Sequence, residues 1–199
     1  PILRMVSHLP NKDSKGIIGP WVHEYPEVAT PGPRIGFQQI AMEWWSKYLS
    51  NDPAQVKDKY FQFDDLKPLT AYIQDPSSIK DSYQHREGKW VSLNYPQQPQ
   101  KVLTYNIESG GKLTQDKPPQ EDLNIKFSGD QEHGLVRGTW CPFGQEGDFP
   151  ADQKIEDSKS VTFDTDFFES DVELLGFPEL NVSISSDKKI ANLSARLVD

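Results

Sequence analysis

His23 is the side chain in this sequence whose surroundings could support chemistry. It closes the run Gly19-Pro20-Trp21-Val22-His23, and the preceding run Lys15-Gly16-Ile17-Ile18 predicts a short buried strand that delivers the histidine into a loop. An imidazole held in such a loop can act as a catalytic base. A catalytic histidine needs a nucleophile, yet the 199 residues contain no Gly-x-Ser-x-Gly turn that could activate a serine. The sequence therefore predicts one part of an enzyme active site.

Two helices are predicted on either side of this strand and loop. The first carries apolar residues at turn spacing at Ile2, Val6 and Leu9, and the second carries a broad apolar stripe from Phe37 to Leu49. The second helix follows Pro31-Gly32-Pro33 and is expected to end around residues 50–53, where Asn, Asp and Pro occur together. Its helical spacing favours core packing as the role of Trp44, Trp45 and Tyr48.

From about Leu69 onward the chain predicts strands, because apolar and polar residues alternate. Turn-forming clusters such as Ser109-Gly110-Gly111 separate the candidates, and a two-sheet sandwich is the architecture we expect. The stretch from Gly138 to Ser158 lacks periodicity, and its aromatic residues indicate a loop packed by its own side chains. The strand candidates centre on Leu69/Ala71/Ile73, Leu103/Tyr105/Ile107, Leu123/Ile125/Phe127, Leu180/Val182/Ile184 and Leu193/Ala195/Leu197.

Composition excludes several classes of partner. A net charge of -9, from 30 acidic and 21 basic residues, disfavours nucleic acid and anionic membrane surfaces. No apolar run approaches the roughly 18 residues of a membrane span, and no phosphate-binding glycine motif predicts a nucleotide cofactor. The single cysteine, Cys141, excludes an internal disulfide and a multi-cysteine metal site. The compartment stays open, with the cytoplasm favoured slightly over the periplasm.

The other titratable residues are expected to be structural or solvated. His8, His85 and His133 have no partners at metal-ligand spacing and are interpreted as surface residues. The segment between residues 145 and 175 contains ten acidic residues and only two basic ones. An EF-hand starting at Asp164 fails, because Glu169 stands where glycine is needed and Leu175 where glutamate is needed. A solvated acidic face is the expectation, with an irregular calcium site as the alternative, and no metal site is predicted.

These motifs carry a family resemblance. Residues 16–26, Pro31-Gly32-Pro33-Arg34-Ile35-Gly36-Phe37 and Glu43-Trp44-Trp45 resemble the end of the hydrolase domain in X-Pro dipeptidyl-peptidases and cocaine-esterase-like (CocE/NonD) acyl hydrolases. The second half resembles the jelly-roll domain that follows in those enzymes. The matching segments there are Trp140-Cys141-Pro142-Phe143-Gly144, Pro150-Ala151-Asp152-Gln153, Leu175-Gly176-Phe177-Pro178 and residues 185–197.

The resemblance implies a fold and one catalytic position. Residues 1–60 would be the helix-strand-helix end of an α/β-hydrolase domain, and residues 61–199 a galactose-binding-like jelly-roll sandwich that is truncated at its C-terminus. In this family the triad runs serine, aspartate, histidine along the chain, so His23 would be the general base. The serine and the aspartate would precede Pro1, and the fragment alone would be inactive. Lys154 stands where relatives often have arginine, which would replace a guanidinium fork by a point charge.

Three hypotheses for function follow. The first is a fragment of a serine hydrolase that acts on a small ester or on a peptide with proline next to its N-terminus. The second is a stand-alone carbohydrate- or ligand-binding β-sandwich, with Tyr72, Trp90 and Trp140 as stacking faces. The third is a structural lid that limits substrate size. A truncated sandwich would also leave a sheet edge unpaired, which predicts self-association through that edge.

Overall fold

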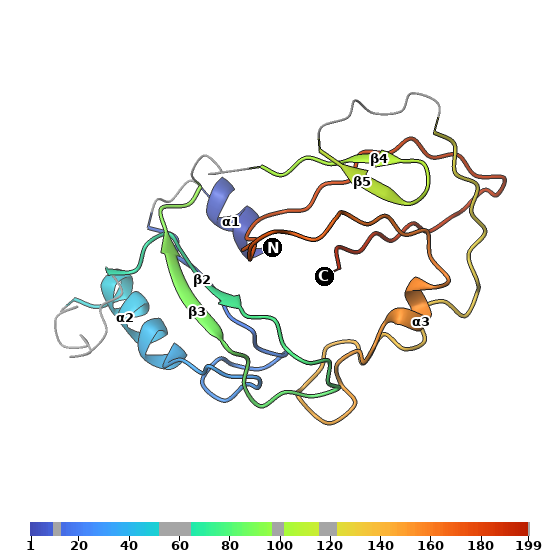
Figure 1. Ribbon diagram of the computed structural model, residues 1–199. Helices are drawn as coiled ribbons and strands as arrows, with labels where there is room; N and C mark the ends of the chain where they lie inside the picture. Colours follow the sequence, from blue (N-terminus) through green and yellow to red (C-terminus); the bar gives the residue numbers. More distant parts are fainter. Residues whose placement is uncertain (10–12, 52–64, 97–101, 116–122, 199) are drawn as a thin grey trace.

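The computed structural model describes residues 1–9, 13–51, 65–96, 102–115 and 123–198 (Figure 1). Within these ranges the chain forms three helices and two small sheets. In chain order the elements are α1 (Ile2–His8), β1 (Gly16–Ile18), α2 (Phe37–Leu49), β2 (Leu69–Gln74), β3 (Gly88–Leu93), β4 (Asn106–Glu108), β5 (Lys112–Thr114) and α3 (Lys154–Asp157). The predicted helix, strand and second helix of the first fifty residues are confirmed.

The larger sheet has the strand order β1-β2-β3. β1 pairs with β2 in parallel, with Gly16 opposite Leu69 and Ile18 opposite Ala71, whereas β2 and β3 are antiparallel. Parallel neighbours need a long crossover connection, and here that connection contains α2. Figure 1 shows α1 and α2 on opposite sides of this sheet. The sheet joins residues from both sides of the expected boundary at residues 60 and 61, and that boundary stays a prediction.

The small core lies between α1 and the first two strands. Leu69 is 0 % exposed and Ala71 1 %, and Leu3 of α1 is also buried. A Cβ at Gly16 would collide with the side chains of Ile2 and Val6, so the glycine permits the close approach of α1 to β1. Burial of these aliphatic side chains fixes the strand that leads to His23.

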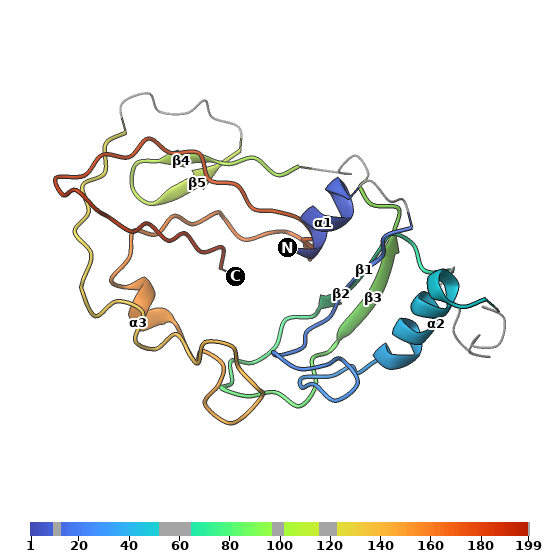
Figure 2. The ribbon, with the colours of Figure 1, turned by 180° about the vertical axis from the view of Figure 1, so that it is seen from behind.

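The smaller sheet is the hairpin β4–β5. Its turn is the predicted Ser109-Gly110-Gly111 cluster, in which both glycines have positive φ, 80° and 76°, a conformation that costs glycine little. The segment around Asp164 runs alongside, because Leu113 N donates to Asp164 O at 2.8 Å and Asp164 N to Gly111 O at 2.9 Å. Figure 2 shows this hairpin on the far side of the molecule from α2.

The expected jelly-roll sandwich differs from the sheets of the described residues. β2 confirms the candidate at residues 69–73, and β4 confirms only the end of the candidate at residues 103–107. The three candidates at residues 123–127, 180–184 and 193–197 form no strand, and most of their apolar side chains are exposed, Leu180 to 52 % and Leu193 to 64 %. Alternation defines an apolar face, but a strand also needs a neighbour to complete its hydrogen bonds. The described residues form few helices and two small sheets, and the jelly-roll stays a prediction.

The predicted core role of the α2 stripe is wrong for Trp45 and Tyr48, which are 55 % and 39 % exposed. Glu43 and Ser46 are the buried residues of this helix. Trp44 instead contacts its neighbours, with ring centroids 4.7 Å from Trp45 and 4.9 Å from Tyr48. The aromatic rings therefore shield one another on the helix surface. No helix of the described ranges has both the length and the apolar character that a membrane crossing requires.

A guanidinium contact joins α3 to the last segment of the chain. Arg196 donates to the Asp157 carboxylate and, at 3.3 Å, to Gln153 Oε1. Lys154, at the position discussed above, pairs instead with Asp152 at 3.8 Å across exposed side chains. Arg196, which is distant in sequence, thus supplies the guanidinium that the segment around Lys154 lacks.

Candidate active site

His23 follows the carboxyl end of β1, which closes at Ile18. Gly19 lies between them, and a Cβ there would collide with the Trp21 indole, so the glycine allows the chain to fold the indole back over the turn. In sheets with parallel strands, functional groups gather in the loops beyond the carboxyl ends of the strands. His23 occupies such a loop.

The loop around His23 is closed by its own hydrogen bonds. Trp21 Nε1 donates to Pro33 O at 2.8 Å, and Val22 N donates to Thr30 O at 3.0 Å. Val22 and Ala29 are buried, and Arg34 Nε donates to Ala29 O at 3.1 Å. The residue immediately before the histidine is therefore fixed by burial and by a backbone bond.

The backbone of His23 is also held by the aperiodic stretch from Gly138 to Ser158. His23 N donates to Pro142 O at 3.0 Å. The Phe143 ring meets the imidazole edge to face, with centroids 5.9 Å apart and an interplanar angle of 80°. His23 is exposed, and its ring nitrogens have no hydrogen-bond partner within the described ranges. The imidazole is thus oriented by its backbone and one aromatic neighbour, and both nitrogens remain available.

Asp148 shapes the loop that carries Pro142 and Phe143. Its Oδ2 accepts hydrogen bonds from Phe143 N and Gln145 N, both at 2.8 Å. These bonds, first of all the one from Gln145 N, hold the pKa of Asp148 below its ordinary value, against the opposing effect of burial. Asp148 O also accepts from Thr139 N at 2.8 Å. Sequence reasoning missed this residue; the available signal was a long aperiodic loop with aromatic side chains.

The three aromatic residues proposed as stacking faces do not form a common platform. Tyr72 and Trp90 contact each other at 5.1 Å, and Trp90 also contacts Trp21 at 6.0 Å. The Tyr72 hydroxyl donates to Arg86 O at 2.9 Å, and burial is the main cause that raises the Tyr72 pKa. Trp140 is 84 % exposed, and no ring contact joins it to the other two in the described part of the chain. Tyr72 and Trp90 therefore pack against each other, and Trp90 also packs against Trp21 of the His23 loop.

His133 belongs to a second polar cluster, at α3. Its Nε2 lies 3.3 Å from Glu156 Oε2 and 3.2 Å from Ser160 Oγ. A catalytic triad uses one imidazole nitrogen for the serine and the other for the carboxylate. Here both contacts are made by the same nitrogen, and Ser160 Oγ donates to Glu156 O at 2.9 Å. The cluster is a structural contact.

The remaining two histidines lie at the surface, as predicted. His8 contacts Arg4 O at 2.9 Å, and the His85 side chain, 50 % exposed, lies 3.9 Å from Glu87. No group of three or more His, Cys, Asp or Glu side chains able to hold a metal ion occurs in the residues that the structure describes. Several carboxylates of the acidic region accept protein hydrogen bonds instead, namely Asp148, Asp152, Glu156 and Asp157.

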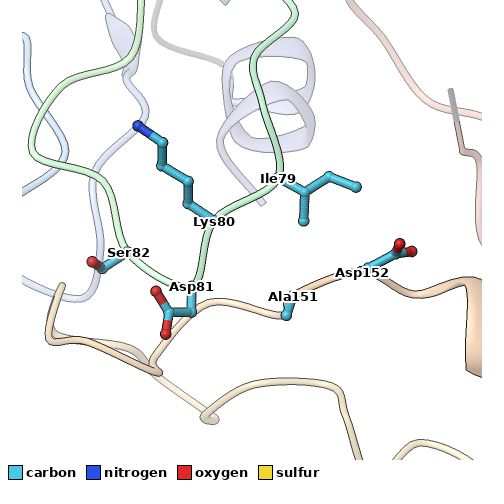
Figure 3. Close-up of a pocket in the computed structure, with 6 residues that line it drawn as sticks. All are labelled: Ile79, Lys80, Asp81, Ser82, Ala151 and Asp152. Atoms are coloured by element: carbon cyan, nitrogen blue, oxygen red, sulfur yellow. The ribbon is translucent and has the colours of Figure 1, made fainter.

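An open hollow of about 670 Å³ lies away from His23. In Figure 3 the carboxylates of Asp81 and Asp152 point in different directions, and the Lys80 amine extends away from Ala151. A ligand site needs polar groups that converge on one point. This hollow has none, although its wall contributes Asp81 O, which accepts from Phe149 N at 2.9 Å. The lining residues are Ile79, Lys80, Asp81, Ser82, Ala151 and Asp152.

Comparison with known proteins defines the class of the second half. The sequence model of the X-Pro dipeptidyl-peptidase C-terminal non-catalytic domain matches residues 62–199. The chain belongs to this family, which confirms the resemblance for the C-terminal portion and places the chain among proteins of a hydrolase family. No curated protein and no solved structure matched the chain. The matched domain is itself non-catalytic, and His23 lies outside the matched residues.

Proposed function

We propose that the chain is the part of a serine hydrolase, of the X-Pro dipeptidyl-peptidase or CocE acyl-esterase type, that carries the triad histidine together with the C-terminal β-rich domain. His23 is the general base. The substrate is a small ester or a peptide with proline next to its N-terminus. The serine and the carboxylate of the triad lie on a segment outside these 199 residues.

The position of His23 carries this proposal. The residue lies beyond the carboxyl end of a parallel strand, its backbone is anchored on two sides, and its ring nitrogens are unbonded within the described ranges. β1 pairs with β2 on one side only, and its other edge has no strand partner among the described residues. That edge is suited to accept the next strand of a larger parallel sheet. The family match supports the same assignment.

The chemistry asked of His23 is proton transfer. One ring nitrogen takes the serine proton during attack on the carbonyl and then gives it to the leaving group. The other nitrogen donates to the triad carboxylate, which selects the tautomer. The Phe143 ring contacts the imidazole edge to face, which restricts the orientation of the ring. An exposed imidazole with both nitrogens available meets these geometric needs before its partners arrive.

The test uses a polypeptide in which this chain is joined to the segment bearing the serine and the aspartate. His23→Ala should lower kcat roughly 10⁴-fold or more, because the loss of one triad member disables the whole triad. His8→Ala, a second exposed histidine, should leave kcat unchanged. Circular dichroism establishes that both variants fold. Persisting activity in folded His23→Ala would exclude His23 as the base.

A further inference from the structure

The His23 imidazole is held by a segment that lies within the family-matched, non-catalytic region. Pro142 O accepts the His23 backbone N–H, and the Phe143 ring meets the imidazole edge to face. Both residues lie between positions 62 and 199, the matched range. The orientation of the proposed base therefore depends on how the loop of residues 139–149, here called the bracing loop, is itself fixed.

The bracing loop is organised around Asp148. The Asp148 carboxylate receives the backbone N–H groups of Phe143 and Gln145, and Asp148 O receives that of Thr139. Asp148 N donates in turn to Gln145 O at 3.1 Å. The Asp148 side chain thus gathers the main-chain donors of Phe143 and Gln145, while its main-chain carbonyl takes that of Thr139 at the start of the loop. A carboxylate that receives two N–H groups makes stronger bonds than a neutral acceptor would.

The base of the bracing loop is tied to another segment. Phe149 N donates to Asp81 O at 2.9 Å, and the Phe149 ring contacts Tyr83 edge to face at 5.6 Å. Phe149 anchors the end of the bracing loop in this way. The hydrogen bonds inside the turn then determine how the rest of the loop reaches His23. Glu146 offers a contrast, since it is an exposed acidic residue of the same loop with no side-chain hydrogen bond in the described structure.

We infer that Asp148 is a positioning residue, which orients the His23 imidazole through Phe143 and Pro142. The inference rests on the proposed function only for the consequence that this orientation has for catalysis. The domain described as non-catalytic then contributes to the active site by fixing the geometry of the base. A base displaced by about 1 Å can cost about 10²-fold in rate, so such bracing is a large effect.

The first test measures geometry and needs no activity. In the 199-residue chain, the His23 ring proton resonances are assigned with a His23→Gln variant, and they should carry a ring-current shift from Phe143. Asp148→Ala should move them toward the values of a solvent-exposed histidine, and Phe143→Leu should move them in the same direction. Glu146→Ala should leave them at the wild-type values. Unchanged His23 resonances in folded Asp148→Ala overturn the inference.

A second variant covers the case in which Asp148→Ala does not fold. Asp148→Asn keeps the size of the side chain and one acceptor oxygen but removes the charge, so we expect a smaller shift in the same direction. Unchanged resonances in folded Asp148→Asn would likewise overturn the inference. The ring signals of His8, His85 and His133 serve as internal references, because they lie outside the bracing loop.

The second test measures catalysis in the joined hydrolase. Asp148→Ala should lower kcat by about 10- to 100-fold with little change in KM, because the substrate contacts stay and the base is misplaced. Glu146→Ala should match wild type in both constants. If His23→Ala abolishes activity while Asp148→Ala keeps the wild-type kcat, the inference fails and the proposed function stands. If His23→Ala stays active, the proposed function fails, whereas the resonance shifts still report on the bracing.

Discussion

The carboxylate of Glu156 lies 3.3 Å from Nε2 of His133, and Glu156 is only 3 % exposed. Its oxygens also accept from Gly134 N at 2.8 Å and from Val136 N at 3.3 Å. α3 thus holds the turn that precedes it through one buried acid. Removal of that acceptor would leave two part-buried backbone donors without their partner, which lowers stability.

Acid should weaken the contacts made by the Glu156 carboxylate. The Gly134 N–H is the main cause that holds the pKa of Glu156 below its ordinary value of 4.5, while burial opposes it. A pKa lower in the folded than in the unfolded state adds stability above about pH 4.5, which is lost as the pH falls through the folded-state pKa. Thermal unfolding measured between about pH 3 and about pH 7 should therefore show Tm falling on acidification.

The matched variants for this prediction are Glu156→Gln and Glu132→Gln. Glu156→Gln should have a lower Tm near neutral pH and a flatter dependence of Tm on pH in acid. Glu132 is an exposed acidic residue of the neighbouring turn, and its variant should follow the wild-type curve. Equal acid slopes in wild type and Glu156→Gln would contradict the assignment.

Trp21 should stabilise the His23 loop through its indole N–H. Trp21→Phe keeps an aromatic ring beside Trp90 but removes the bond to Pro33 O, and we expect a loss of about 1 kcal/mol in the free energy of unfolding. Urea denaturation followed by circular dichroism measures it. Trp140→Phe is the control, because Trp140 is largely exposed and should change little. Equal losses in both variants would argue against a special role for the indole bond.

The chain alone should lack esterase activity. The proposed base has no serine partner with an activating Gly-x-Ser-x-Gly turn in this sequence, so no acyl-enzyme can form by the triad route. Stopped-flow kinetics with a p-nitrophenyl ester should show neither a burst nor turnover above background. A burst proportional to protein concentration, and abolished by His23→Ala, would mean that the chain carries its own nucleophile.

We propose that the exposed apolar side chains of residues 167–198, here called the apolar face, pair with a second copy of the chain in solution. Phe167 and Ile190 are 103 % and 85 % exposed, and the described residues of this segment have no strand partner, which favours pairing between chains. Sedimentation velocity should show a sedimentation coefficient that rises with protein concentration.

Substitutions separate this apolar face from exposure elsewhere. Phe167→Ser combined with Ile190→Ser should weaken the concentration dependence, whereas Leu135→Ser, at a comparably exposed site outside the face, should not. An ideal monomer at all concentrations would refute self-association through this face.

The sequence by itself determined the features that depend on neighbouring residues. The spacing of apolar residues predicts α1, α2 and β1, and the paired glycines predict the turn between β4 and β5. The Gly-Pro-Trp-Val-His run singled out His23, and the family resemblance of the second half is confirmed by the match over residues 62–199. Helix periodicity, turn geometry and motifs are local properties, so composition and spacing are enough to specify them.

Only the tertiary structure decided which distant segments meet. The pairing of β1 with β2 and the bond from His23 N to Pro142 O join parts of the chain that are far apart in sequence. β3 and the burial of Glu156 occur where the sequence has no periodic pattern that would predict them. Residues 180–184 alternate between apolar and polar side chains but form no strand. The alternation indicates an apolar face but does not supply the neighbouring strand that would complete the hydrogen bonds. Strand pairing and loop docking depend on the surface that lies opposite, and a linear pattern does not specify that surface.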